Sequence, residues 1–164
     1  MLKRWSFSKI GMCLVISAAL LQTAASSAME SVKLFHPDVV TVLVTKDSSG
    51  HQLGDVRVVS IPVRNGSAEV VGRLDAMLLT TGIDAPAKDD ETRISELVFT
   101  LNDGGVLIIG GSGYYPAQGP TLSRGVALVR PIKGGSGTYA GARGWAESIR
   151  GADGNWTHTF NLMK

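Results

Sequence analysis

The regular spacing of β-type segments constrains the fold of this chain most strongly. Eight runs rich in β-branched and other apolar residues alternate with short glycine-, asparagine- and aspartate-containing sequences, and helical periodicity is almost absent beyond residue 28. The runs cover residues 39–46, 55–64, 67–81, 92–101, 105–110, 123–133, 143–150 and 155–163. Short strands at this spacing are typical of an all-β barrel or sandwich.

The sequences between these runs contain the residues that tight turns require. Asn65-Gly66 between two alternating runs predicts a β-hairpin, and 102–105 (NDGG) and 151–154 (GADG) predict two further turns. Residues 82–91 and 111–122 are expected to form longer loops. A loop of the second length is often functional, although a cover over the barrel rim or a subunit contact is the alternative.

The N-terminal segment is expected to be a separate, removable unit. Lys3, Arg4 and Lys9 precede a short apolar run, which is followed by small residues that end at Ala28. This pattern predicts a cleaved secretory signal peptide over 1–28 and a periplasmic or secreted domain over 29–164. The apolar run is shorter than the roughly 20 residues that span a bilayer. An uncleaved N-terminal anchor is the alternative.

Removal of this leader changes the charge and the cysteine content of the chain. Three of the 16 lysines and arginines lie in it, so the exported domain carries 13 basic against 14 acidic residues, a formal charge of −1. This balance does not favour binding to nucleic acid, and no membrane insertion is expected after cleavage. Cys13 leaves with the leader, which excludes disulfides and thiolate metal sites from the domain.

Familiar catalytic and metal-binding motifs are missing from the sequence. It contains no HExxH, GxSxG or CxxC motif, and His36, His51 and His158 do not have the spacing of metal ligands. His36 and His51 are expected to be solvated. A metal hydrolase or a serine hydrolase is therefore disfavoured, and neither a metal nor another cofactor is expected.

The glycine-rich stretch 134–144 (GGSGTYAGARG) is expected to be a structural corner. It lacks the GxxxxGK[ST] pattern of a phosphate-binding loop, and no helix is expected to follow it. A flexible linker is also disfavoured, because β-type sequence resumes at Trp145. Glycines at a tight corner permit left-handed dihedrals and close backbone approach.

This corner also carries a family resemblance. Residues 133–144 resemble the GGSG/GGTG-x-[FY]-x-x-[AV]-x-G signature of plant allene oxide cyclases, dirigent proteins and their bacterial barrel relatives. Further matching pieces follow in the same order: Leu53-Gly54-Asp55, Val71-Gly72, Phe99 before the NDGG turn, and the closing 158–162. The resemblance implies an eight-stranded antiparallel β-barrel with a small central cavity, and often a homotrimer.

The resemblance does not extend to the polar residues of the plant cyclases. Where those proteins are expected to carry a carboxylate, an asparagine and a cysteine, this sequence has Leu43, Ile61 and Leu78. None of these side chains performs polar chemistry, so the allene oxide cyclase reaction is doubtful for this chain. The polar lumen residues of dirigent proteins have no clear counterparts here.

The last hairpin offers a candidate acid–base pair. If Arg150 pairs with Asn155 across the GADG turn, Glu147 lies opposite His158 on one face. On a lumenal face, Glu147 and His158 would form a catalytic unit. On an outer face, the pair would belong to a subunit contact. The same face would carry Trp145, Trp156 and Phe160 as ligand-binding residues.

Five further residues are candidates for ligand contact. Tyr114, Tyr115 and Tyr139 combine a flat ring with a polar tip, although packing at the rim is the alternative. Glu96 alternates with apolar neighbours and could face inward, and Arg130 could pair with it or with Glu147. A purely structural role is the alternative for both.

These observations lead to three functional hypotheses. The first is an exported barrel that binds a small apolar or aromatic molecule in its lumen, without catalysis or with weak catalysis. The second is an isomerase or cyclase that uses Glu147 and His158 to move a proton. The third is a structural or interaction protein whose lumen is filled by side chains.

Overall fold

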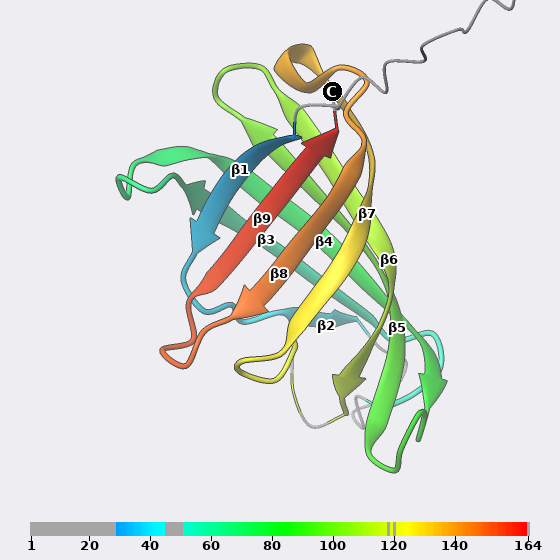
Figure 1. Cartoon of the computed structure of the whole chain (residues 1–164). Helices are drawn as coiled ribbons and strands as arrows, with labels where there is room; N and C mark the ends of the chain where they lie inside the picture. Colours follow the sequence, from blue (N-terminus) through cyan, green and yellow to red (C-terminus); the bar gives the residue numbers. More distant parts are fainter. Residues whose placement is uncertain (1–28, 45–50, 118, 120, 164) are drawn as a thin grey trace, which may run out of the picture.

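The computed structural model describes residues 29–44, 51–117, 119 and 121–163. The predicted signal peptide lies outside these residues. Within the described part of the chain, nine strands and one short 3-10 helix form almost all of the regular structure (Figure 1). The elements are β1 (Met29–His36), β2 (Val42–Val44), β3 (Val56–Arg64), β4 (Val70–Ile83), β5 (Asp90–Leu101), β6 (Val106–Pro116), β7 (Ala127–Ser136), η1 (Gly137–Tyr139), β8 (Gly144–Arg150) and β9 (Trp156–Met163).

The strands close into an eight-stranded antiparallel barrel, as the sequence predicted. From β3 to β9 each strand pairs with the next one along the chain, and β1 pairs with β9. β1 and β2 together occupy one strand position, because both pair with β3. The ladder between β1 and β3 has a single residue pair, Phe35–Arg64.

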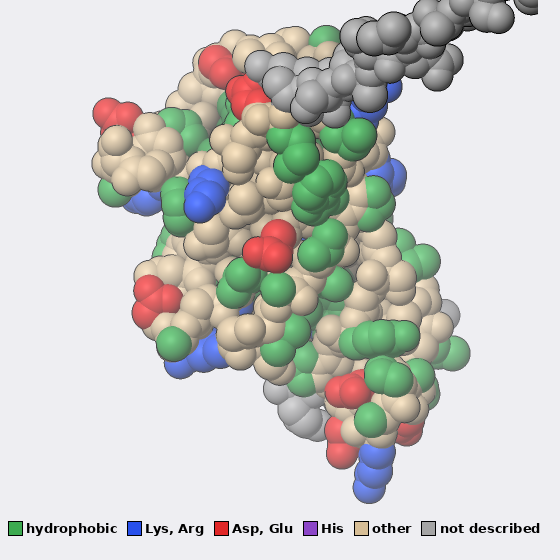
Figure 2. All heavy atoms as spheres, viewed as in Figure 1, with side chains coloured by type: hydrophobic (Ala, Val, Ile, Leu, Met, Phe, Trp, Pro, Cys, Tyr) green, Lys and Arg blue, Asp and Glu red, His purple; other side chains and the backbone are tan. Residues whose placement is uncertain are grey.

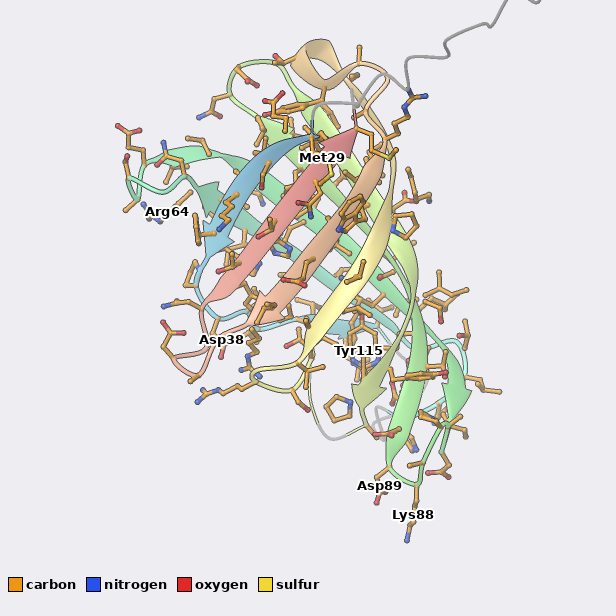
Figure 3. The ribbon with its side chains drawn as sticks, in the orientation of Figure 1. Met29, Asp38, Arg64, Lys88, Asp89 and Tyr115 are labelled. Carbon is orange, nitrogen blue, oxygen red and sulfur yellow. The ribbon has the colours of Figure 1, made fainter. Side chains whose placement is uncertain are left out.

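The two ends of the barrel differ in character. Towards the upper end in Figure 1, where β1 begins at Met29, the lumen is filled by a cluster of apolar side chains. Phe99 and Phe160 are fully buried in this apolar core and pack edge to face, with their ring centroids 5.0 Å apart. Tyr115 lies at the lower end of the barrel, away from Met29 (Figure 3). A small functional space can therefore lie only in the lower half.

The outer face carries both hydrophobic and charged side chains. Figure 2 shows hydrophobic side chains scattered over the visible face of the barrel, with acidic and basic side chains among them. Val129 and Trp145 are among the exposed hydrophobic residues. None of the helices in the described residues is long and apolar enough to cross a membrane.

Several of the predicted element boundaries were wrong, including the loop expected over 82–91, whose ends belong to β4 and β5. Residues 29–36 form β1, which the sequence did not suggest, and β2 begins at Val42, three residues after the start of the predicted strand 39–46. β6 continues to Pro116, so Tyr114 and Tyr115 lie on a strand and not in a loop. Each of these strand ends pairs with a distant partner, and such pairing stabilises a strand that local sequence alone does not favour.

The glycine-rich stretch is the structural corner that the sequence predicted. β7 runs through Gly135 to Ser136, η1 turns the chain, and β8 starts at Gly144. A Cβ atom on Gly135 would lie 2.5 Å from the carbonyl oxygens of both Val106 and Tyr139. The glycines are needed because the corner packs directly against backbone.

Gly137→Ala is expected to destabilise the barrel by about 2–4 kcal/mol. Gly137 has φ +59°, and a Cβ atom there would lie 2.1 Å from the carbonyl oxygen of Gly104. The substitution therefore combines left-handed strain with a backbone clash. Urea unfolding monitored by circular dichroism measures the change.

Gly66→Ala provides the control for this substitution. Nothing lies within 4 Å of the position that its Cβ would take, so a change within about 0.5 kcal/mol is expected. Equal effects of the two substitutions would contradict the assignment of the corner as a tightly packed element.

Candidate functional site

The lower half of the barrel contains a cavity. Its free volume is about 430 Å³ including the part open to solvent, and about 40 Å³ of this can hold the centre of a water molecule. The cavity is lined by side chains from the inner faces of the strands and from the connecting segments: His36, Val39, Thr41, Val59, Leu74, Ala76, Leu78, Leu97, Tyr115, Thr121, Arg130, Trp156 and His158. Aliphatic and aromatic groups thus surround a small number of polar ones.

Three parallel rings form a flat wall of this cavity. His36 at the end of β1 stacks on Trp156 and His158 of β9, with ring centroids 5.7 and 5.1 Å away, respectively. The rings of Trp156 and His158 are 5.9 Å apart and inclined by only 9°. The wall exists because β1 and β9 pair in register, with His36 opposite Trp156 and Leu34 opposite His158.

Arg130 is the charged group at the cavity. It is only 3% exposed, and it donates hydrogen bonds from Nε to Ser95 Oγ (2.8 Å), from one terminal nitrogen to Ser148 Oγ (3.3 Å) and from the other to the Tyr115 hydroxyl (2.5 Å). All three partners are neutral. Burial of an unpaired guanidinium is costly, so this arrangement needs a physical reason other than stability.

A hydrogen-bond chain of fixed direction leads away from Arg130. The Pro37 carbonyl can only accept, so His36 Nδ1 donates to it (2.7 Å) and, in a neutral ring, His36 Nε2 must accept. His158 Nε2 therefore donates to His36 Nε2 (3.0 Å), and His158 Nδ1 accepts from Ser148 Oγ (2.8 Å). Both ring nitrogens of His158 are thus engaged within the protein.

Burial keeps both histidines neutral. It lowers the pKa of His158 well below the usual 6.5, and the adjacent His36 and the positive charge of Arg130 act in the same direction. Burial also lowers the pKa of His36, against the opposing influence of its hydrogen bond to Pro37 and the charge of Asp38. The neutral state of both rings agrees with the direction of the hydrogen-bond chain.

The free energy of unfolding is expected to fall as the pH drops from 6.5 to 5. The unfolded chain takes up a proton on each of His36 and His158 in this range, whereas the folded chain takes up fewer because both pKa values are lowered. The slope has an upper limit of about 1.4 kcal/mol per pH unit for each histidine. Urea unfolding at a series of pH values measures it.

Two substitutions distinguish the source of this pH dependence. His158→Gln should remove its share of the slope. His51→Gln should not reduce the slope, since the hydrogen bond to Glu91 raises the pKa of His51. The folded chain therefore binds this proton more readily than the unfolded chain, so His51 opposes the fall near pH 6.5 and its removal should make the fall slightly steeper. A constant free energy of unfolding between pH 6.5 and 5 would contradict neutral buried histidines.

A second polar cluster surrounds Glu91, which is fully buried. Its Oε2 accepts hydrogen bonds from Arg93 Nε (2.6 Å), Thr80 Oγ1 (3.0 Å) and Arg57 (3.3 Å), while Oε1 contacts His51 Nδ1 (2.8 Å). Burial opposes ionisation of this carboxyl, but the hydrogen bonds from His51 and Arg93 outweigh it and hold its pKa below the usual value. The cluster is an internal ion-pair network.

Tyr115 connects the two clusters. The guanidinium of Arg93 lies 4.9 Å from the centroid of its ring, and Arg130 donates to its hydroxyl oxygen. Arg93 is itself fixed by hydrogen bonds to the carbonyls of Pro116 and Gly119, both 3.3 Å long. The ring is therefore held from two sides, with its hydroxyl group directed to the cavity wall.

The predicted pairing of Glu147 with His158 is wrong. Arg150 pairs with Trp156 and not with Asn155, so Glu147 lies opposite Thr159, and Ser148 lies opposite His158. The reason is the turn: Gly151 and Asn155 are hydrogen-bonded across a three-residue connection, in which Gly154 has φ +91°. A shift of one residue moves every side chain of β8 to the other face.

The structure separates the other predicted ligand-binding residues into three groups. Tyr115, Trp156 and Arg130 line the cavity. Phe160 lies within the apolar core, and Tyr139 packs against that core from η1.

The third group lies outside the lumen. Tyr114 (61% exposed) and Trp145 (38% exposed) lie on the outer face. Glu96 is also exposed and pairs with Lys133, which corrects its predicted partnership with Arg130. β5 places Leu97 and Phe99 inward, and strand alternation therefore turns Glu96 outward.

Several residues of the site were missed by the sequence analysis. His36 was expected to be solvated but is 4% exposed, because β1 was not recognised. Glu91, Arg93 and Ser95 share the inner face of β5 with Leu97 and Phe99. Every second residue of a strand lies on the same face, and Glu91, Arg93 and Ser95 are spaced by two from Leu97 and Phe99. This spacing was a signal that could have identified them as inward-facing residues.

The described residues contain no group of three or more His, Cys, Asp or Glu side chains that could hold a metal ion. The donor set at the cavity is also of a different kind. It consists of a guanidinium, hydroxyl groups, an indole N–H and two histidines that are bonded to each other or to neighbouring groups. Such groups suit an organic ligand better than a cation.

Comparison with solved structures supports the predicted fold. A pyocyanin demethylase superposes on 83% of this chain and 100% of its own, with a TM-score of 0.61 and 17% identity. A pterocarpan synthase dirigent protein covers 82% of this chain and 83% of its own (TM-score 0.57, 15% identity). An exo-specific intermolecular Diels-Alderase covers 84% and 99% (TM-score 0.58, 17% identity).

These likenesses establish a barrel fold shared with a dirigent protein, a demethylase and a Diels-Alderase. No protein-family model matches the sequence, and no curated protein sequence matches it significantly. At such low identities the similarity extends to the fold, while residues of the site have to be argued from this chain itself.

Proposed function

We propose that this chain is an exported β-barrel that binds a small apolar or aromatic molecule in its lumen. The observation that carries the proposal is the cavity in the lower half of the barrel. Aliphatic side chains and the stacked rings of His36, Trp156 and His158 line it, and a few polar groups converge on it. Ligand sites of small molecules have this composition.

The structural neighbours support the same class of function. Their names describe demethylation of pyocyanin, synthesis of pterocarpan and an intermolecular Diels-Alder reaction, all of which concern small organic molecules. An eight-stranded barrel is just wide enough to hold one such molecule. The apolar core fills the upper half, so the ligand would occupy only the lower half.

Binding fits this site better than acid–base catalysis. Both ring nitrogens of His158 are used in hydrogen bonds to Ser148 and His36, so the ring has no free position for a substrate proton. Glu147 lies on the outer face, across from Thr159. The two groups on which an isomerase reaction would depend are therefore on opposite sides of the barrel wall.

Native mass spectrometry of the chain purified from the cells that produce it tests the proposal. An additional small-molecule mass that is lost on denaturation is expected. The same spectrum reports whether three chains form one complex, as the predicted homotrimer requires. It also reports whether the mass is that of residues 29–164, as signal cleavage requires. A bare polypeptide that also binds no added aromatic compound would contradict the proposal.

A further inference from the structure

Several polar groups around the cavity can donate hydrogen bonds that no group of the described residues accepts. Trp156 Nε1 and Thr121 Oγ1 have no hydrogen-bond partner among the described residues, although the two side chains are only 6% and 7% exposed. An indole N–H can only donate. Buried polar atoms without a partner are rare in folded proteins, and each one calls for an explanation.

Arg130 and Tyr115 add further donors to the same cavity. Arg130 has five N–H groups and uses three of them for Ser95, Ser148 and Tyr115. The Tyr115 oxygen accepts from Arg130, which leaves its own O–H free to donate. No bond of this hydroxyl to a protein acceptor is found in the described part of the chain. At least four donor groups thus surround the cavity.

The cavity also carries an uncompensated positive charge. None of its lining residues is an aspartate or a glutamate, and both lining histidines are neutral. The fully buried carboxylate of Glu91 is already held by Arg57, Arg93 and His51. In the described residues no acidic side chain forms an ion pair with Arg130, so this part of the chain leaves the charge of Arg130 without a counter-charge.

The remaining walls of the cavity are apolar. Leu74, Leu78 and Leu97 lie on the inner faces of β4 and β5, while the stacked rings of Trp156 and His158 belong to β9. Water alone would satisfy the donors but would leave these apolar surfaces in contact with water. An inorganic anion would have the same shortcoming. A ligand with a charged end and an apolar body satisfies both parts.

We propose that the lumenal ligand is a small organic oxyanion, with an aromatic or aliphatic body against the leucines and rings and a carboxylate-like oxygen group on Arg130, Tyr115, Thr121 and Trp156. This inference rests on the proposed function and specifies the chemical class of its ligand. Charge-assisted hydrogen bonds to a guanidinium and a phenol are the strong ones at such a site.

Benzoate and benzamide form the matched pair of probes for this proposal. They have the same ring and nearly the same shape, but only benzoate carries a charge. Trp145→Phe leaves Trp156 as the sole tryptophan of residues 29–164, so its fluorescence reports on the cavity wall. Benzoate is expected to bind with a Kd on the order of 10- to 100-fold lower than that of benzamide.

Substitutions in this background assign the preference to residues. Arg130→Met should reduce the difference between the two probes to about twofold, because it removes the charge while retaining an apolar chain. Tyr115→Phe should weaken benzoate binding about tenfold and leave benzamide less affected. Tyr115→Phe also keeps the proposal testable if Arg130→Met does not fold. Arg73→Met, the same change of charge on the exposed outer face, should leave both affinities unchanged.

The outcomes separate this inference from the proposed function. Equal affinities for the two probes would contradict the proposal that the ligand is an oxyanion and would still support a site for an apolar ligand. Retention of the benzoate preference in both Arg130→Met and Tyr115→Phe would overturn the assigned residues. Failure of both probes to bind, in fluorescence and in thermal unfolding, would overturn the oxyanion inference and the lumenal site together. A benzoate preference that disappears with Arg130 supports the proposal.

Discussion

Glu91→Gln is expected to lower the free energy of unfolding by about 3–5 kcal/mol, one of the two largest effects that we predict for a single substitution. Glu91 is fully buried and accepts hydrogen bonds from Arg93, Thr80 and Arg57 on one oxygen. Glutamine preserves the size of the side chain but removes its charge. Two buried guanidinium groups would then face each other without an anion between them.

The expected loss is large because the removed partner is buried. Breaking a buried ion pair leaves the remaining charge desolvated, whereas breaking an exposed pair returns both groups to water. The effect should also depend on pH. Since the pKa of Glu91 is lowered in the folded state, the stability that it contributes is present above about pH 4.5 and is lost as the pH falls through the folded pKa.

Glu96→Gln is the matched control, five residues further along the same strand. Glu96 pairs with Lys133 on the outer face, where both side chains are nearly half exposed, and a loss below about 1 kcal/mol is expected. Urea unfolding at pH 7 of the two variants measures the difference. Similar losses in both would mean that the Glu91 network does not hold the lower end of the barrel together.

Phe99→Ala is expected to cost about 3–5 kcal/mol. The ring of Phe99 is fully buried between the apolar core and the polar lower half, with its centroid 5.0 Å from those of both Phe160 and His158. Its removal leaves a cavity that the rigid barrel wall cannot close by collapse. Tyr114→Ala, the loss of an exposed aromatic side chain on β6, should change stability by much less.

The same substitution should also make the protein responsive to apolar ligands. The space left by Phe99 adjoins His158, which lines the existing cavity, so the two spaces would merge. Apolar cavities of this kind bind benzene. Thermal unfolding of Phe99→Ala with and without benzene should show a rise in Tm that the unsubstituted protein shows to a smaller extent. A Tm that benzene leaves unchanged in both proteins would indicate that the barrel closes around the lost ring.

The sequence predicted the strands of this barrel well where the signals were local. The hairpin at Asn65-Gly66, the turn 102–105 and the glycine-rich corner depend on a few neighbouring residues, and the structure has all three, although the hairpin connection extends to Glu69 and its left-handed residue is Ala68. Turns of this kind can be predicted from a single sequence because the residues that form a turn are adjacent to one another.

The parts that could not be predicted depend on distant pairing. β1 is stabilised by β9 at the other end of the domain, so nothing near Met29–His36 indicates a strand. The register of β8 and β9 depends on whether the GADG turn leaves three or four residues unpaired, and both are common connections. The difference of one residue exchanged Glu147 for Ser148 as the neighbour of His158.

The polar side chains inside the barrel were missed for a different reason. Alternation of polar and apolar residues usually means that the polar side faces water. On β5 the inner face changes character along the strand, from Leu97 and Phe99 to Glu91, Arg93 and Ser95. A rule that assigns polar side chains to the surface therefore fails in the half of the barrel that carries the candidate site.

The shared strand position of β1 and β2 has a consequence for how a ligand enters. On its other side β3 pairs with β4 over nine residue pairs, but β1 meets β3 at the single pair Phe35–Arg64 and β2 adds only three pairs. Val39 and Thr41, in the segment between β1 and β2, line the cavity. This seam should show faster amide hydrogen exchange than the β3–β4 ladder, so that solutes reach the interior through a local opening that costs far less than global unfolding.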